Sequence, residues 1–570
     1  MRKFRSLFVL AIASVIMTGC SGLNKMKKNA DLVDYQVVPE VLEAHAGQVP
    51  LTIKGTFPEK YFKKKVTLTA VPVLTYATGE KAYDKVQVLQ GEKVLANNQV
   101  IKYSGGNFTY TSTIPYNPAM RVSELYLNVT GEKGKKSVVF DPIKIADGVI
   151  ATSTLVDNTA SRPAVIPDQY VRITPENQIA DINYVINRSD IRSSELKGDD
   201  IAALKDYIAA VDADPNREFK SAVVSSYASP DGKEDQNEKL AGKRGESADK
   251  YFAKEFKDIE SADPVALLTS KITAEDWEGF QAEVQASNLQ DKDLILRVLS
   301  MYADPAVRER EIKNMSAAYD ALKDDILPKL RRSVITVNVD KIGRSDAEIL
   351  ATARTNFNDL SLEEQLRAGS LTNDLNEQLS FYQKTMAAHP RDYRAANNAG
   401  CVQLQLGRAA DALDSFAKAA AINNTDEVKS NTGFAYILNG EYDKAIASFN
   451  SMNTSTLASK YGNGIVNIVK GEYDQAVNNM NDAADANLAL AQILKGDINR
   501  AKSTLDAISN PSARASYLKA IVGARTDNKD YLMNNLRAAV SADSTYKEFA
   551  RTDVEFAKYW NDSTFQSIVR

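Results

Sequence analysis

Cysteine and histidine are nearly missing from this sequence of 570 residues. Two cysteines, Cys20 and Cys401, exclude a disulfide framework and a thiolate zinc site. The two histidines, His45 and His389, lie far apart in the sequence and leave almost no material for a histidine-based triad or a two-histidine metal site. A strong net charge is also absent: at −4, the chain has no basic footprint for nucleic acid. We therefore expect no catalytic activity, no metal or other cofactor, and no nucleic-acid partner.

Long hydrophobic runs are confined to the N-terminus. Basic residues there precede an apolar run from Leu7 to Met17, which is too short to cross ~30 Å of hydrocarbon but typical of a signal peptide. The run leads through Thr18 and Gly19 directly to Cys20. After Cys20 no run approaches the ~18 residues of a membrane-spanning helix. The pattern predicts a signal peptide over residues 1–19.

The residues Met17-Thr-Gly-Cys20 resemble the signal of bacterial lipoproteins, in which the cysteine is lipidated and becomes the first residue of the mature chain. The resemblance implies that Cys20 carries the lipid. Residues 20–34 follow as a basic tether with Lys25, Lys27 and Lys28. These lysines suit contact with anionic lipid headgroups.

Residues 35–148 alternate apolar and polar side chains with a period of two, most clearly around Leu68 and Leu127. This alternation indicates half-buried strands, and about eight short strands between turns predict a β-sandwich. Its residues leave open whether it binds a partner or only spaces other domains. Residues 149–170 contain Pro163 and Pro167 and predict a linker.

Residues 171–342 read as strand, helix, strand and helix, which predicts an α+β domain. We expect strands over 179–186 and 219–227, a helix over 195–211 and another from about 235. A charged, helix-rich stretch over about 253–328 is predicted to be an insertion before a final strand over 333–340. Its adjacent carboxylates are expected to be solvated helix surface.

The turn from Ser226 to Gly232, together with Asn237, Leu240 and Arg244, resembles the OmpA-like periplasmic domain in its Bacteroidota form. In that family the domain binds peptidoglycan. An Asp in the turn and the Arg of the following helix hold the diaminopimelate residue. Arg244 matches this Arg, and we expect it at the open end of a helix, outside the core.

The resemblance therefore implies a peptidoglycan site at Arg244, Ser229, Asp231 and Asn237. A guanidinium can hold a carboxylate through two charge-assisted bonds, and an Asp can accept from an ammonium. The family's Asp position is occupied by Ser229, which is uncharged, and Asp231 lies two residues further along. The residues leave two alternatives open: a working pocket with altered geometry, or a retained fold with a decayed site.

Residues 345–570 repeat with the 34-residue period of tetratricopeptide units. Gly400 and Phe416 recur as Gly433 and Phe449, and then as Gly464 with Met480. The small residues let the two helices of a hairpin approach, and the large side chain fills the space to the next hairpin. The pattern predicts an all-α solenoid, in which Cys401 is a small core residue and not a nucleophile.

Such solenoids bind peptides or proteins in the concave groove made by the first helices of successive hairpins. Five asparagines lie on or near these helices and can bond an extended backbone: Asn397, Asn398, Asn431, Asn463 and Asn467. The alternative for each is solvated helix surface.

Taken together, the order of parts resembles the OmpA-like and tetratricopeptide-repeat lipoproteins of Bacteroidota. It implies a multidomain, non-enzymatic protein-binding scaffold on the outer membrane. In Bacteroidota lipoproteins, export to the cell surface is associated with acidic residues just after the lipidated cysteine. Because the residues after Cys20 are basic here, we expect the protein on the periplasmic face of the membrane. The implied partners are the membrane, through the lipid, an unidentified periplasmic or outer-membrane protein, and peptidoglycan. Two alternatives remain: a purely structural anchor between outer membrane and cell wall, or a subunit of an outer-membrane assembly or secretion complex.

Overall fold

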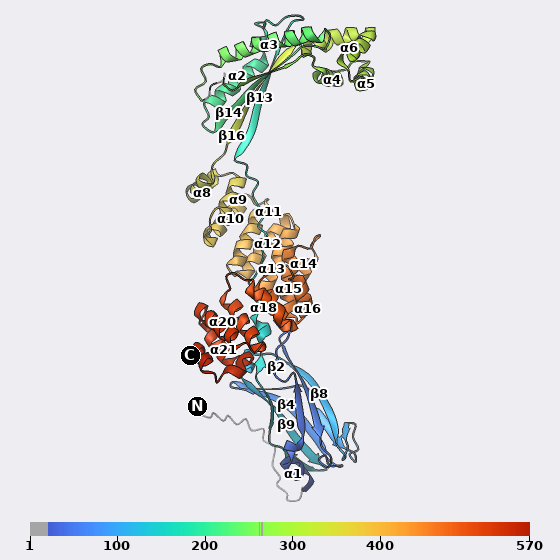
Figure 1. The fold of residues 1–570 in the computed structure, drawn as a ribbon, viewed down its shortest axis with the longest axis vertical. Coiled ribbons are helices and arrows are strands. Elements are labelled where there is room, and N and C mark those ends of the chain that lie inside the picture. The colour runs from blue at the N-terminus through green and yellow to red at the C-terminus, as the bar shows by residue number, and fades with distance from the viewer. Residues whose placement is uncertain (1–20, 262, 264–265) are drawn as a thin grey trace. The chain divides into compact units, whose positions relative to one another are not determined.

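The computed structural model describes residues 21–261, 263 and 266–570 (Figure 1). The predicted signal peptide and Cys20 lie outside these residues. The chain forms two compact units, and residues 167–372 make up one of them. The other unit combines the residues before Pro167 with those from Asn373 onward. Residues 167–372 are therefore inserted into this other unit, and we call them the inserted unit. No helix within the described part of the chain has the length and apolar character needed to cross a membrane.

The N-terminal region is rich in β-structure, as the alternating pattern predicts. A three-stranded sheet has the order β1-β3-β8, and a larger sheet has the order β10-β9-β4-β6-β7, with β11 on β9 and β5 on β4. The inward-facing residues of both sheets share one core, including Ile53 and Leu127. The strands are β1 Asp34–Val38, β2 Leu42–Glu43, β3 Gln48–Phe57, β4 Thr67–Tyr76, β5 Gly79–Ala82, β6 Gln87–Gly91, β7 Gln99–Ile101, β8 Gly106–Pro115, β9 Ser123–Lys133, β10 Lys136–Val139, β11 Ile143–Asp147 and β12 Val149–Ile150.

The segment expected to be a free tether is folded from Ser21 onward. Helix α1 (Ser21–Lys28) lies against this β-region, with Leu23 and Met26 fully buried in its core. The two residues are three positions apart and therefore share one face of the helix. The basic composition of the segment hid this short apolar face.

The inserted unit has an α+β fold. Its sheet has the order β13-β16-β14-β15, from β13 Ile173–Asn183, β14 Arg217–Tyr227, β15 Leu268–Thr273 and β16 Arg332–Ile342. Two helices, α2 Asp199–Asp212 and α3 Glu234–Glu255, share a core with this sheet. Strand β15, parallel to β14, lies inside the stretch over about 253–328 that we expected to be a helix-rich insertion.

From Trp277 onward that stretch is mainly helical, with its own small core around Phe280 and Leu299. Its helices are α4 Trp277–Ala286, α5 Lys292–Met301, α6 Pro305–Asn314 and α7 Ser316–Asp325. Two further helices, α8 Asp346–Thr355 and α9 Leu362–Ser370, belong to this unit. The sequence pattern placed them at the start of the repeats.

The C-terminal region is a stack of helices (Figure 1). These are α10 Leu375–Ala388, α11 Tyr393–Gln405, α12 Ala409–Ile422, α13 Asp426–Leu438, α14 Tyr442–Asn450, α15 Leu457–Val469, α16 Tyr473–Asn479, α17 Ala486–Lys495, α18 Ile498–Asp506, α19 Ala513–Arg525, α20 Lys529–Ala542, α21 Thr545–Thr552 and α22 Ser563–Val569.

The predicted packing inside the helical hairpins is confirmed. A Cβ added to Gly400 would lie 2.5 Å from the Phe416 ring, and one on Gly433 would lie 2.4 Å from the Phe449 ring. Both distances are too short for any residue larger than glycine. The repeated glycines are therefore required by the approach of paired helices.

Part of the predicted linker, residues 149–170, lies against this C-terminal stack of helices. After β12 and a short 3-10 helix (Thr152–Leu155), residues 156–166 have neither helix nor strand. We call residues 155–166 the strap. Because residues 156–166 of the strap belong to no sheet or helix, their backbone groups must find partners elsewhere.

Candidate functional site

The strap lies along the first helices of the hairpins and is bound there through its backbone. Asn431 on α13 contacts Ala164 twice: its Oδ1 accepts from the Ala164 N–H at 2.8 Å, and its Nδ2 donates to the Ala164 carbonyl at 2.9 Å. Asn397 on α11 donates to the same carbonyl at 3.0 Å. An asparagine amide can bond to both main-chain polar groups of one residue in this way.

The same paired contact occurs at two further positions of the strap. Asn398 accepts from the Ile166 N–H and donates to its carbonyl, both at 2.8 Å. Asn487 on α17 accepts from the Asp157 N–H at 3.0 Å and donates to its carbonyl at 3.1 Å. Three asparagines therefore bind three residues of the strap through main-chain atoms alone.

Side chains of the strap add a few more specific contacts. The Arg162 guanidinium stacks 3.7 Å from the centre of the Tyr461 ring and pairs with Asp485 at 3.3 Å. Leu155 is 9% exposed and belongs to the solenoid core, and Ile166 packs against a second cluster that includes Val428. The strap thus has one apolar anchor at each end.

The five asparagines named from the sequence divide into two groups. Asn397, Asn398 and Asn431 contact the strap, as described above. Asn467 instead bonds with residues of its own hairpin, Glu472 and Asn479. Among the described residues, Asn463 has no hydrogen bond to the strap. What binds in the groove in this structure is part of the same chain.

Two residues of the groove were missed from the sequence. Asn487 makes a paired contact, and Arg514 on α19 donates to the Leu155 carbonyl at 2.9 Å and pairs with Asp157 at 3.3 Å. Asn487 could have been found, because it lies on the first helix of a weaker repeat. Cys401 is fully buried beside Ala164, and this burial raises the pKa of its thiol well above the usual value. A thiol held neutral in this way is a poor nucleophile.

The inserted unit has a pocket of about 480 Å³ where the turn after β14 meets α3. Ser229, Asp231, Asn237 and Arg244 all line it, so the structure brings the four residues together. Ser229 donates to Asp231 at 2.6 Å. Asn237 is buried and donates to the carbonyls of Ser229 and Gly232, which holds the turn in place.

Arg331 also lines this pocket and was not selected from the sequence. Its guanidinium donates to Ser229 at 3.2 Å and pairs with Asp231 at 3.3 Å. Asp231 therefore already has a cationic partner within the protein. Arg331 lies in the segment before the last strand, and only folding brings it to the turn.

Arg244 is not at an open helix end, contrary to our expectation. It is 1% exposed, and its guanidinium donates to the carbonyls of Tyr227 at 2.8 Å, Arg188 at 3.1 Å and Val185 at 3.4 Å. Burial lowers its pKa to about 10. Its hydrogen bonds are directed at the protein's own backbone, so a large part of its role is structural.

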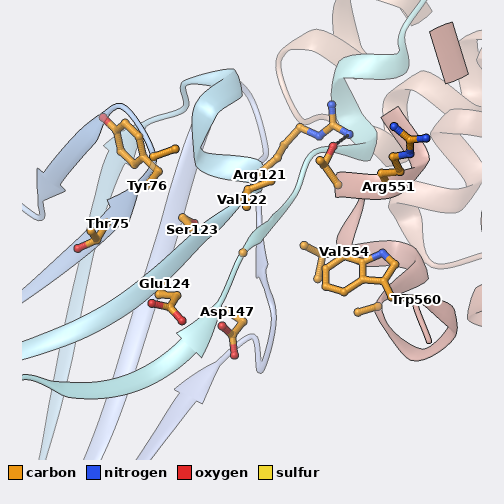
Figure 2. Close-up of a pocket in the computed structure, with 14 residues that line it drawn as sticks. Thr75, Tyr76, Arg121, Val122, Ser123, Glu124, Asp147, Arg551, Val554 and Trp560 are labelled. Carbon is orange, nitrogen blue, oxygen red and sulfur yellow. Dashed lines mark hydrogen bonds between the residues drawn. The ribbon is translucent and has the colours of Figure 1, made fainter. Parts of the chain in front are cut away.

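A second pocket, of about 770 Å³, lies between the β-region and the last helices (Figure 2). Val554 and Trp560 form one wall, and Val122, Glu124 and Asp147 lie on the opposite side. Arg121 crosses at its edge: it donates to the Phe549 carbonyl at 2.6 Å and stacks on the Phe549 ring. Both carboxylates in this pocket are near Lys144, which pairs with each of them.

Metal ligands are not grouped anywhere in the described residues: they contain no cluster of three or more His, Cys, Asp or Glu side chains that could hold an ion.

Comparison with known proteins gives matches among solved structures alone, since no family model and no curated protein matches the chain. A tetratricopeptide repeat protein from Parabacteroides merdae is 18% identical, covers 43% of this chain and 98% of its own, and has a TM-score of 0.31. The APC/C hetero-tetramer Cut9-Hcn1 is 12% identical, covers 51% of this chain and 58% of its own, and has a TM-score of 0.33. YrrB, a tetratricopeptide protein with an unusual peptide-binding site, is 16% identical, covers 36% of this chain and 99% of its own, and has a TM-score of 0.21. With such identities and scores, these similarities carry no functional argument.

Proposed function

We propose that this protein is a non-enzymatic scaffold whose helical groove binds extended segments of other proteins. One observation supports this above all: the groove already holds an extended polypeptide through the paired contacts of Asn398, Asn431 and Asn487. Because these contacts use main-chain atoms, they are largely independent of the bound sequence. A partner segment binds here in exchange for the strap.

A synthetic peptide of residues 153–168 tests this proposal. The strap is weakened in the full-length chain by Ile166→Asp, which places a charge where an apolar anchor packs. We expect the labelled peptide to bind this variant at least about tenfold more tightly than wild type, because the intact strap competes at a high effective concentration. Fluorescence anisotropy measures both affinities.

The matched control is the same peptide with an N-methyl group on Ala164. This peptide cannot donate the hydrogen bond from the Ala164 N–H to Asn431 Oδ1, while every side chain is unchanged. It should therefore bind weakly. If the unmodified peptide fails to bind a variant that circular dichroism shows to be folded, the groove is not an exchangeable binding site.

We further propose that the chain is a lipoprotein of the outer membrane, facing the periplasm and attached through lipid on Cys20. The proposal rests on the sequence before Cys20. We expect Cys20→Ala to move the protein from the membrane fraction to the aqueous fraction, because a lipid cluster is the strongest apolar anchor available. Cell fractionation measures this, and continued sedimentation of the unlipidated variant with membranes even at high salt would contradict it.

The α+β unit is proposed to be OmpA-like and to hold peptidoglycan. Its support is the pocket in which Ser229, Asp231 and Arg244 meet, with Arg331 as an additional cation. A purely structural anchor would be retained on purified peptidoglycan and bring no other protein with it. A subunit of an assembly or secretion complex would instead co-purify with that complex from solubilised membranes.

A further inference from the structure

One end of the β-region is distinct from the end that contacts the helices. The strands β3 and β9 run between these two ends. At the helical end, His45 bonds to Tyr473 at 2.7 Å, and Arg121 donates to Phe549. At the other end lie α1 and the connections β3–β4, β6–β7, β7–β8 and β9–β10 (Figure 1).

Several contacts tie α1 and these turns into a single surface. The Tyr61 hydroxyl donates to the Met26 carbonyl at 3.0 Å, and the Lys93 N–H donates to the Lys64 carbonyl at 2.7 Å. Gly131, next to the β9–β10 turn, lies against Leu23.

Lysine dominates this surface, which we call the lysine end. It comprises twelve lysines: Lys25, Lys27, Lys28, Lys60, Lys63, Lys64, Lys65, Lys93, Lys102, Lys133, Lys135 and Lys136. Ten of them are exposed. The carboxylates in the same segments are half as many: Asp31, Asp34, Glu59, Glu92, Glu132 and Asp141. The chain as a whole carries −4, so this positive charge is a local feature.

Two exposed leucines lie in the same segments as these lysines. Leu95, in the turn after Lys93, is fully exposed, with a relative exposure of 103%. Leu32, just after α1, is 56% exposed. A fully exposed leucine two residues after Lys93 offers an apolar group to any surface that attracts the lysines.

We propose that the lysine end binds the surface of a bilayer rich in anionic phospholipid, with Leu95 inserted between the headgroups. Basic clusters near a membrane are attracted by its negative surface potential, and an apolar side chain gains by entering the boundary with the acyl chains. The position of the surface fits, because Ser21 begins α1 at this end. Only that positional argument rests on the proposed lipid at Cys20.

A soluble polyanion such as a nucleic acid or an acidic polysaccharide would also attract the lysines. It would gain nothing from Leu95, however, because it offers no apolar environment. The exposed leucine therefore favours a lipid surface, and the two ligands can be separated by changing that residue.

The experiment uses residues 21–570, which lack both Cys20 and the apolar run Leu7–Met17, so that neither the lipid nor this run contributes. We expect this chain to co-sediment with vesicles of phosphatidylglycerol and phosphatidylethanolamine at low salt, and to be released at high salt or with vesicles of phosphatidylcholine alone. The triple variant Lys65→Glu, Lys93→Glu and Lys135→Glu should bind at least about tenfold more weakly. All three lysines are exposed.

The matched control reverses three exposed lysines elsewhere, Lys250, Lys418 and Lys460, and should bind as the starting chain does. Leu95→Asp should weaken vesicle binding and leave binding to heparin nearly unchanged. Equal loss in both triple variants, or no binding to anionic vesicles, would overturn the proposal. If Leu95→Asp has no effect and heparin competes fully, the surface binds polyanions. Fractionation of the lipidated protein can succeed or fail independently of these outcomes.

Discussion

Arg244→Ala is expected to destabilise the inserted unit strongly. The guanidinium is buried and donates to three backbone carbonyls, those of Val185, Arg188 and Tyr227. Leaving a buried acceptor without a donor costs roughly 1–3 kcal/mol, so three together amount to about 3 kcal/mol or more. That is a large fraction of the ~5–15 kcal/mol that stabilise a typical domain.

The two tryptophans of the chain make this measurable, because each unit has one of them. Trp277 lies in the inserted unit and Trp560 in the other. In a Trp560→Phe background, fluorescence during urea unfolding reports on the inserted unit alone. We expect the Arg244→Ala midpoint to fall sharply.

Arg188→Ala is the matched control, because its charged group is exposed and pairs only loosely with Asp190 at 3.7 Å. It should change stability by less than about 0.5 kcal/mol. An unchanged midpoint in Arg244→Ala would show that the guanidinium does not hold the turn together. Its role would then have to be sought in ligand binding.

The second large effect is expected at Asn431. Its alanine variant leaves the N–H of Ala164 without its acceptor and removes a donor to Asn397, which lies at 2.8 Å. Both asparagines are fully buried. We expect a loss of about 2–4 kcal/mol in the unit that contains the strap. Trp560 fluorescence in a Trp277→Phe background measures it.

Asn463→Ala provides the control for this change. The residue has the same side chain and lies on a neighbouring first helix, α15, but it is only partly buried. Its replacement should alter stability by less than about 0.5 kcal/mol. Equal effects of the two variants would mean that the strap contributes little to stability.

Local patterns predicted the parts of this fold whose causes are local. Alternation with a period of two predicted the β-region, and the spacing of Gly400 and Phe416 predicted how paired helices approach. Asn397, Asn398 and Asn431 were selected because their amides can bond a backbone, and in the structure they bond to the backbone of the strap. Repeats and pleats leave such marks in sequence because neighbouring positions share one environment.

Features that depend on distant segments were not predictable. Nothing near Asn431 shows that Ala164, 267 residues earlier, will occupy the groove. The guanidinium of Arg244 bonds to carbonyls from the loop after β13 and from the end of β14, and Arg331 reaches Asp231 across 100 residues. A motif match specifies which residue types occur, whereas the partner of each side chain depends on the complete fold.

The insertion of one unit into the other determines how a mechanical force would travel through the chain. From Ser21 to the inserted unit, the covalent path runs through the β-region and then the strap, and the helices from Asn373 onward lie outside it. Tension between the membrane anchor and the cell-wall attachment that we propose would therefore load the asparagine contacts of the strap. Each contact that breaks would lengthen the chain and uncover part of the groove, so the strap would act as a force-sensitive cover.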